Sequence, residues 1–189
     1  RPPAIVRLVF HLGIGIILAG LIISLMEFTL GIRGAGIGLL IVAAWLLRYD
    51  MAWRSIKQGD LPRFMALCLI AGYVWLALGS VLWIFFAPFY SAGTYYDAML
   101  HAIFLGFVFS MIFAHGPIIL PIITGLRLPF QNIFYLHASL LHLSLILRIA
   151  GDLGTWGLLQ RWGGLLNGLA ILMFLAANIR AVKKGNQSH

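Results

Sequence analysis

Histidine is the residue type whose number and placement suggest chemistry in this sequence. Five of the six histidines lie inside long apolar stretches or at their ends. A neutral imidazole is a metal ligand that costs little to bury, whereas a carboxylate is expensive at membrane depth. No acidic residue falls in the middle of an apolar stretch, so the pattern favours a haem or metal site over a proton-coupled transporter. The five histidines are His11, His101, His115, His137 and His142, while His189 lies at the C-terminus and is expected to have no role.

The spacing of His101 and His115 is that of two residues on one helical stripe. Fourteen residues turn an α-helix by about 1400° and extend it by about 21 Å, so both rings should lie on one face. Because an imidazole directed into acyl chains would have no hydrogen-bond partner, we expect both to face the interior of the bundle. Respiratory b-type cytochromes hold two haems with such a pair, but they need a matching pair on a second helix. His137 and His142 are about 140° apart around their helix, so the two-haem interpretation is incomplete.

Depth within the apolar stretches groups the histidines differently. His11, His115 and His137 fall toward the face that the charge pattern makes cytoplasmic, and His142 lies deeper. Axial ligation of one haem needs two imidazoles on facing helices. We therefore expect haem b or a metal ion to be bound by His115 with a partner from His11, His137 or His142. His137 and His142 are alternatives, because two histidines five residues apart on one helix cannot both ligate one haem.

A second set of residues falls toward the opposite face. His101, with Asp97 one turn before it, is the candidate for a second metal site. Met111 is a candidate soft ligand for copper, although a methionine at such a position more often only packs. Arg148 also falls toward this face. A buried arginine needs an anion, and a haem propionate would satisfy it.

Simpler interpretations exist for these residues. A single intramembrane histidine more often hydrogen-bonds a neighbouring helix than binds a metal, but five of them on three apolar stretches favour a haem or metal site. Three glycines in the first apolar stretch most simply permit a neighbouring helix to approach closely. These are Gly13, Gly15 and Gly20.

Composition shows that membrane helices must position these side chains. Hydrophobic residues make up 62% of the 189 residues, charged residues make up 10%, and the mean hydropathy is +1.00. A soluble domain carries roughly a quarter charged residues. The formal charge of +8 lies mostly between or at the ends of apolar stretches, which is typical of a membrane protein and not of one that binds nucleic acid. The lone cysteine, Cys68, excludes a disulfide framework within the chain and a thiolate metal cluster.

The fold class predicted is all-α: one polytopic domain over residues 1–189, a bundle of about six transmembrane helices. A hydrocarbon core of about 30 Å needs roughly twenty apolar residues. The predicted spans cover about residues 6–28, 34–53, 64–86, 98–123, 133–149 and 165–179. The second is the weakest, because its apolar part runs only from Gly34 to Leu47. Pro117 and Pro121 should kink or fray the end of the fourth.

Lysine and arginine are distributed unequally between the two ends of these spans. With a cytoplasmic N-terminus, ten of them are cytoplasmic and three lie on the far side. This asymmetry predicts a multi-pass protein of the inner (cytoplasmic) membrane with both termini cytoplasmic. The ten are Arg1, Arg7, Arg48, Arg54, Lys57, Arg63, Arg127, Arg180, Lys183 and Lys184, and the three are Arg33, Arg148 and Arg161.

Two segments resemble a known family. The stretch from His101 to Met111 begins H-A-I-F-L-G, and Leu140 to Arg148 reads L-L-H-L-S-L-I-L-R. Together with the glycine-rich last span, over about residues 97–180, they resemble the NnrS-like family. Those proteins are polytopic membrane proteins that bind haem and copper and are associated with nitric oxide and nitrosative stress.

The resemblance carries over to four residues of this chain: His101, Gly106, Met111 and Arg148. The chain is about half the length of the family. The family's polar segment R-x-x-L-G-H-T-G-R is replaced here by His115-Gly116-Pro117, without the arginines. Ligand roles for His115, His137 and His142 therefore rest on this sequence alone.

Two functions of different classes fit these observations. The first is a haem- or metal-binding membrane protein that transfers electrons or handles a small gas such as nitric oxide, with redox partners or quinol as electron donors. The second is a non-catalytic accessory subunit of a respiratory or photosynthetic complex, bound to the bilayer and to other membrane subunits. A transporter is disfavoured, because no broken helices or buried carboxylates mark a substrate path.

Overall fold

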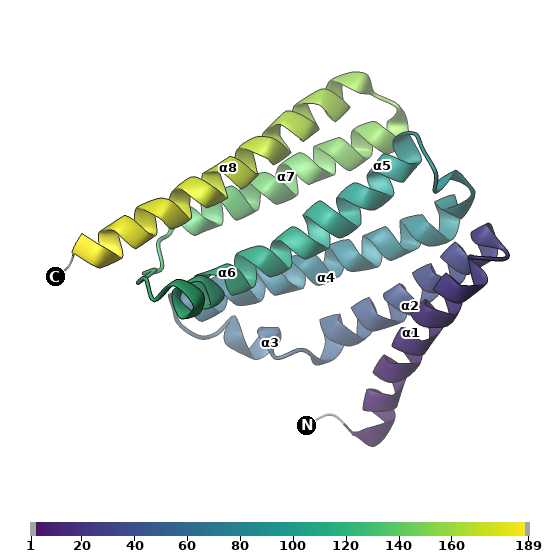
Figure 1. Cartoon of the computed structure of the whole chain (residues 1–189), viewed down its shortest axis with the longest axis horizontal. Helices are drawn as coiled ribbons and strands as arrows, with labels where there is room; N and C mark the ends of the chain where they lie inside the picture. The colour runs from purple at the N-terminus through teal and green to yellow at the C-terminus, as the bar shows by residue number, and fades with distance from the viewer. Residues whose placement is uncertain (1–2, 188–189) are drawn as a thin grey trace.

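The computed structural model describes residues 3–187, and this part of the chain is all-helical (Figure 1). Six of its helical segments are long and apolar enough to cross a membrane, which confirms the predicted all-α fold and the predicted number of helices of this length. The segments are α1 (Ala4–Ile23), α2 (Phe28–Tyr49), α4 (Asp60–Phe86), a helix made of α5 (Thr94–Leu100), η2 (His101–Val108) and α6 (Phe109–Thr124), then α7 (Ile133–Gly154) and α8 (Gly157–Gln187). His189 lies outside the described residues.

The helices lie side by side in the order in which the chain makes them (Figure 1). The α1–α2 hairpin forms one edge and the α7–α8 hairpin the other, with α4 and the α5–η2–α6 helix between them. The short α3 (Ala52–Ser55) and the 3₁₀ turn η1 (Ala87–Phe89) lie in connections. Because the six segments alternate in direction, residues 3 and 187 lie at the same end, which we call the terminal end.

Aromatic side chains from four helices form the main core. Phe64 of α4, Phe113 of α6, Phe134 of α7 and Phe174 of α8 belong to one cluster of buried residues. Their rings and the small alanines between them hold the helices together by close packing, which in lipid has to replace the hydrophobic effect. By contrast, α1 buries only two residues, Gly13 and Gly20, and contacts only its neighbour α2 closely.

Glycines set the contact between α1 and α2. A Cβ placed on Gly20 would lie 2.4 Å from the main-chain nitrogen of Ala35, and one on Gly13 would lie 2.9 Å from a methyl group of Val42. The expected close approach is therefore confirmed at these two positions. It is wrong for Gly15, where a Cβ would meet nothing within 4 Å.

Several helix boundaries differ from the predicted ones. The first span ends at Ile23, and the second begins at Phe28, so Arg33 lies inside a helix. The last two helices extend well beyond their apolar parts, since hydrogen bonding continues a helix into polar flanks that hydropathy alone trims off. The helix also runs through Pro117 and Pro121 as far as Thr124, so these prolines do not end it.

The middle of the fourth span is a π-helix. Residues 101–108 form i→i+5 hydrogen bonds, whereas the flanking α5 and α6 are α-helical. A wide turn absorbs one extra residue, which shifts the relative direction of the flanking side chains by about 100°. The rotation calculated for an uninterrupted α-helix between His101 and His115 therefore does not hold.

Candidate functional site

His115 lines an apolar hollow between α6 and α8. The hollow has a volume of about 320 Å³ and opens on the outside of the helix row. His115 itself is exposed, so the expectation that it faces the bundle interior is wrong, and the π-helix before it gives the physical reason. The lining residues are Ile112, His115, Gly116, Ile119, Leu120, Phe174, Leu175 and Asn178.

The imidazole of His115 is held in one tautomer. Its Nδ1 lies 2.8 Å from the carbonyl oxygen of Met111, and a carbonyl can only accept a hydrogen bond. Nδ1 therefore carries the proton, and Nε2 keeps a free lone pair. This is the arrangement of a metal-ligating histidine, whose other nitrogen usually donates to a carbonyl or carboxylate.

Asn178 is the second polar residue in the lining of this hollow. It is 8% exposed, and its Nδ2 donates to the carbonyl oxygen of Phe174 at 2.7 Å. Its Oδ1 is buried without a hydrogen-bond partner among the described residues. Nε2 of His115 and Oδ1 of Asn178 thus both carry lone pairs, which suit a metal centre or a hydrogen-bond donor.

His101 and His11 have the same local geometry as His115. Nδ1 of His101 lies 2.6 Å from the carbonyl oxygen of Asp97, and Nδ1 of His11 lies 2.7 Å from that of Arg7. Both therefore keep a free Nε2. However, His11 is exposed on α1, which packs closely only on α2, so the structure does not bring it to His115.

His137 is the most enclosed histidine. It is 1% exposed, and neither ring nitrogen has a hydrogen-bond partner within residues 3–187. Four phenylalanine rings surround it with centroid distances of 4.7 to 6.2 Å. These rings fill the space that a porphyrin would need, so the surroundings of His137 do not fit haem. The four are Phe64, Phe113, Phe134 and Phe174.

His142 has the opposite tautomer. The indole Nε1 of Trp75 donates to its Nδ1 at 3.0 Å, so in the neutral ring Nε2 carries the proton. The lone pair that would ligate a metal is therefore occupied. His142 lines a second hollow, of about 240 Å³, between α4 and α7, together with Phe64, Leu67, Cys68, Ala71, Tyr135, Ala138 and Ser139.

Arg148 is the centre of a charged cluster at the end opposite the terminal end. Its Nε donates to Asp152 at 3.1 Å, its Nη2 to Asp97 at 3.3 Å and its Nη1 to the carbonyl oxygen of Gln160 at 3.1 Å. His101 lies beside it, with Nδ1 4.0 Å from the carboxylate of Asp152. Two carboxylates of the chain already pair with Arg148, so the expected reason for a propionate there is removed.

Asp152 is the residue of this cluster that the sequence analysis missed. It is fully buried, and its second oxygen, Oδ1, has no hydrogen-bond partner in the described part of the chain. It follows the apolar stretch of its span and so escaped the search for buried acids. Its spacing of four residues from Arg148, which places the two on one helical face, was the signal available.

The predicted copper ligands are not brought together. His101 and Met111 are ten residues apart on one helix, so about two turns separate them. The methyl group of Met111 instead lies against α4, where a Cβ on Gly72 would be 2.6 Å from it. Across residues 3–187, no three His, Cys, Asp or Glu side chains form a group that could hold a metal ion.

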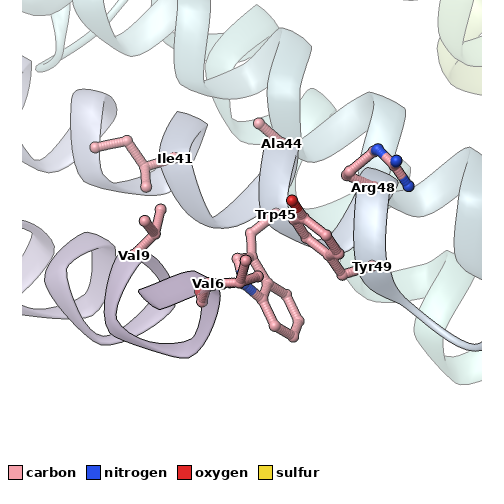
Figure 2. Close-up of a pocket in the computed structure, with 7 residues that line it drawn as sticks. All are labelled: Val6, Val9, Ile41, Ala44, Trp45, Arg48 and Tyr49. Atoms are coloured by element: carbon pink, nitrogen blue, oxygen red, sulfur yellow. Dashed lines mark hydrogen bonds between the residues drawn. The ribbon is translucent and has the colours of Figure 1, made fainter. Parts of the chain in front are cut away.

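A third hollow lies between α1 and α2 (Figure 2). Its volume is about 400 Å³, and its walls include Val6, Val9 and Ile41. Trp45 closes one side by donating to the carbonyl oxygen of Val6 at 2.7 Å. Arg48, whose guanidinium lies 5.3 Å from the ring centre of Tyr49, adds one cation to the lining. The lining is therefore mostly apolar, with Arg48 as its one cation.

Fold and sites together define an all-helical protein with six helices of membrane-spanning length and with histidines in lateral hollows. The family described as Domain of unknown function (DUF8744) matches residues 2–183, and the chain belongs to this family. No curated protein and no solved structure matches the chain.

Proposed function

We propose that the chain is an integral membrane protein that binds haem b through His115 in the α6–α8 hollow. His115 would hold the iron, and the haem would supply a binding position for a small diatomic gas such as nitric oxide. The proposed location is the inner (cytoplasmic) membrane, with both termini cytoplasmic. Support for the location comes from the six apolar helices and from the ten-to-three distribution of cations.

One observation carries the haem assignment. The Nδ1–H of His115 is fixed on the carbonyl oxygen of Met111, which leaves Nε2 as a lone-pair donor in an apolar hollow. Asn178 adds an unpartnered oxygen to the same lining. Haem iron is a partner that a single neutral imidazole in apolar surroundings can hold.

The lining of the hollow favours gas handling over simple electron transfer. His115 is the one imidazole among its eight lining residues, whereas an electron-transfer haem with two histidine ligands needs a second. Haem bound by one histidine supplies an open coordination position for a diatomic gas. The chain's part is then to hold the iron by His115 and to exclude water with Phe174, Leu175 and the isoleucines of α6. The resemblance of residues 97–180 to NnrS-like proteins points to the same chemistry.

The test is an absorption spectrum of purified protein after reconstitution with haem. We expect a Soret band that shifts when nitric oxide is added, and we expect His115→Ala to abolish or grossly shift it. His11→Ala is the matched control, since His11 has the same tautomer but lies outside the hollow. Met111→Leu should leave the spectrum nearly unchanged. An unaltered spectrum and haem content in His115→Ala would contradict the assignment and transfer it to His101.

A second candidate function is a non-catalytic accessory subunit of a membrane complex. The observation that favours it is α1, which buries only two glycines and leaves large apolar side chains such as Ile5 and Leu8 uncovered. Other membrane subunits or redox partners would then cover this edge. Protein that stays spectrally featureless after reconstitution with haem would favour this function over the first.

A further inference from the structure

We propose that the hollow between α4 and α7 binds the head group of a lipid-soluble quinone, with His142 as the hydrogen-bond donor to a quinone carbonyl. This inference rests on the proposed membrane location but not on haem binding. It assigns to His142 a role different from metal ligation.

Trp75 determines what His142 can offer. An indole N–H can only donate, so the Nδ1 of His142 must accept in the 3.0 Å contact between them. The proton of the neutral imidazole is then on Nε2. Since His142 lines the hollow, the polar group it can present to a ligand there is an N–H donor.

The rest of the lining suits an aromatic ring with oxygen substituents. Phe64, Leu67 and Cys68 of α4 supply apolar walls, and Tyr135 and Ser139 of α7 supply two hydroxyl groups. The volume of about 240 Å³ matches a single-ring head group better than a whole ligand. Leu67 and Ser139 are exposed, so the hollow opens on the side of the helix row that faces lipid in the proposed location.

The chemistry of the donor distinguishes between ligands. An acyl chain would fill the hollow but leave the N–H of His142 without an acceptor, at a cost comparable to that of a lost hydrogen bond. A quinone carbonyl accepts this hydrogen bond and reaches the hollow from the bilayer. Because Trp75 holds the imidazole as a donor at Nε2, the oxidised quinone should bind more tightly than the quinol.

The experiment measures binding of decyl-benzoquinone and of its reduced form to haem-free protein in lipid nanodiscs by calorimetry. We expect the oxidised form to bind the unmodified protein about tenfold more tightly than the reduced form, the effect of one hydrogen bond. His142→Phe should weaken quinone binding about tenfold. His142→Gln keeps an N–H donor and should retain most of the binding. Trp75→Phe frees the tautomer and should remove the preference for the oxidised form.

The matched control is His11→Phe, which alters a histidine outside this hollow and should bind as the unmodified protein does. Decyl-cyclohexane, which has the tail without carbonyls, should not compete. Equal binding by His142→Phe, or competition by decyl-cyclohexane, would overturn the proposal and leave an acyl chain as the occupant. Haem is absent throughout, so this outcome is independent of the spectrum of His115→Ala.

Discussion

The two hollows lined by histidines differ in the hydrogen-bonding group that the histidine has available: an acceptor in one hollow and a donor in the other. In the α6–α8 hollow, the Nδ1–H of His115 donates to a carbonyl oxygen, so Nε2 keeps a lone pair. In the α4–α7 hollow, the Nδ1 of His142 accepts a hydrogen bond from an indole N–H, so Nε2 carries the proton. Residue type alone does not distinguish these cases, because each histidine lies in an apolar helix. The hydrogen-bond partner determines whether the ring is a ligand or a donor.

Asn178 allows a residue-scale prediction. Its buried Oδ1 has no partner among the described residues, and an unsatisfied buried acceptor costs about 1–3 kcal/mol. We expect Asn178→Leu to raise the free energy of unfolding of the haem-free protein by about 1 kcal/mol, and to weaken binding in the α6–α8 hollow. Chemical denaturation in detergent measures the first effect and haem titration the second.

Asn167 provides the matched control for this substitution. Each asparagine has one buried amide atom without a partner among the described residues, but the bond that each one makes differs. The Oδ1 of Asn167 accepts a hydrogen bond of 2.6 Å from the hydroxyl group of Ser144 on another helix, whereas Asn178 donates to a carbonyl of its own helix. Asn167→Leu loses this contact between helices and should therefore lower stability. If both variants lost stability equally, Asn178 would be an ordinary structural residue rather than part of a ligand site.

For Arg148, the sequence predicted the need for an anionic partner but not which group supplies it. The need of a buried arginine for an anion was correctly inferred, but the partner was sought in a cofactor. The pairing with Asp152 could have been found from the four-residue spacing on one helix. The pairing with Asp97 could not, because it depends on the packing of α5 against α7.

At the scale of elements, hydropathy predicts where the helices lie in the sequence. It does not predict which side of each helix faces its neighbours. The six apolar stretches correctly predicted six helices of membrane-spanning length, since length and apolarity can be read directly from the sequence. The π-helical segment carries no such signal, because its eight residues are as apolar as their neighbours. The predicted orientation of His115 was wrong for that reason.

The α1–α2 contact gives a prediction at this scale. A side chain at Gly20 would collide with the backbone of α2, which cannot move away as a flexible side chain does. We expect Gly20→Leu to separate the hairpin and lower the free energy of unfolding by about 1–3 kcal/mol or more. Gly15→Leu, on the same helix with nothing within 4 Å, should be nearly neutral. Thermal unfolding in detergent measures both, and equal effects would show that the helix contact is unimportant.

At the scale of the whole molecule, the distribution of charge predicts one orientation. Single cysteines placed at Ser91 and at Gln58, in a Cys68→Ala background, lie at opposite ends of the helix row. An impermeant maleimide added to intact cells should label Ser91→Cys and spare Gln58→Cys, because Ser91 is at the end with few cations. Labelling of Gln58→Cys alone would reverse the topology.

The π-helical turn in the fourth span has a consequence for changes in chain length. A wide turn contains about one residue more than an α-helical turn of the same height. Deleting one residue between His101 and Val108 would convert the wide turn into ordinary α-helix. The flanking segments α5 and α6 would keep their orientation and their neighbours. Losing one residue anywhere else in the span would rotate half of the helix by about 100° and expose buried side chains such as Phe113. The fourth span therefore has one place, in its wide turn, where a single-residue deletion preserves the packing of both halves.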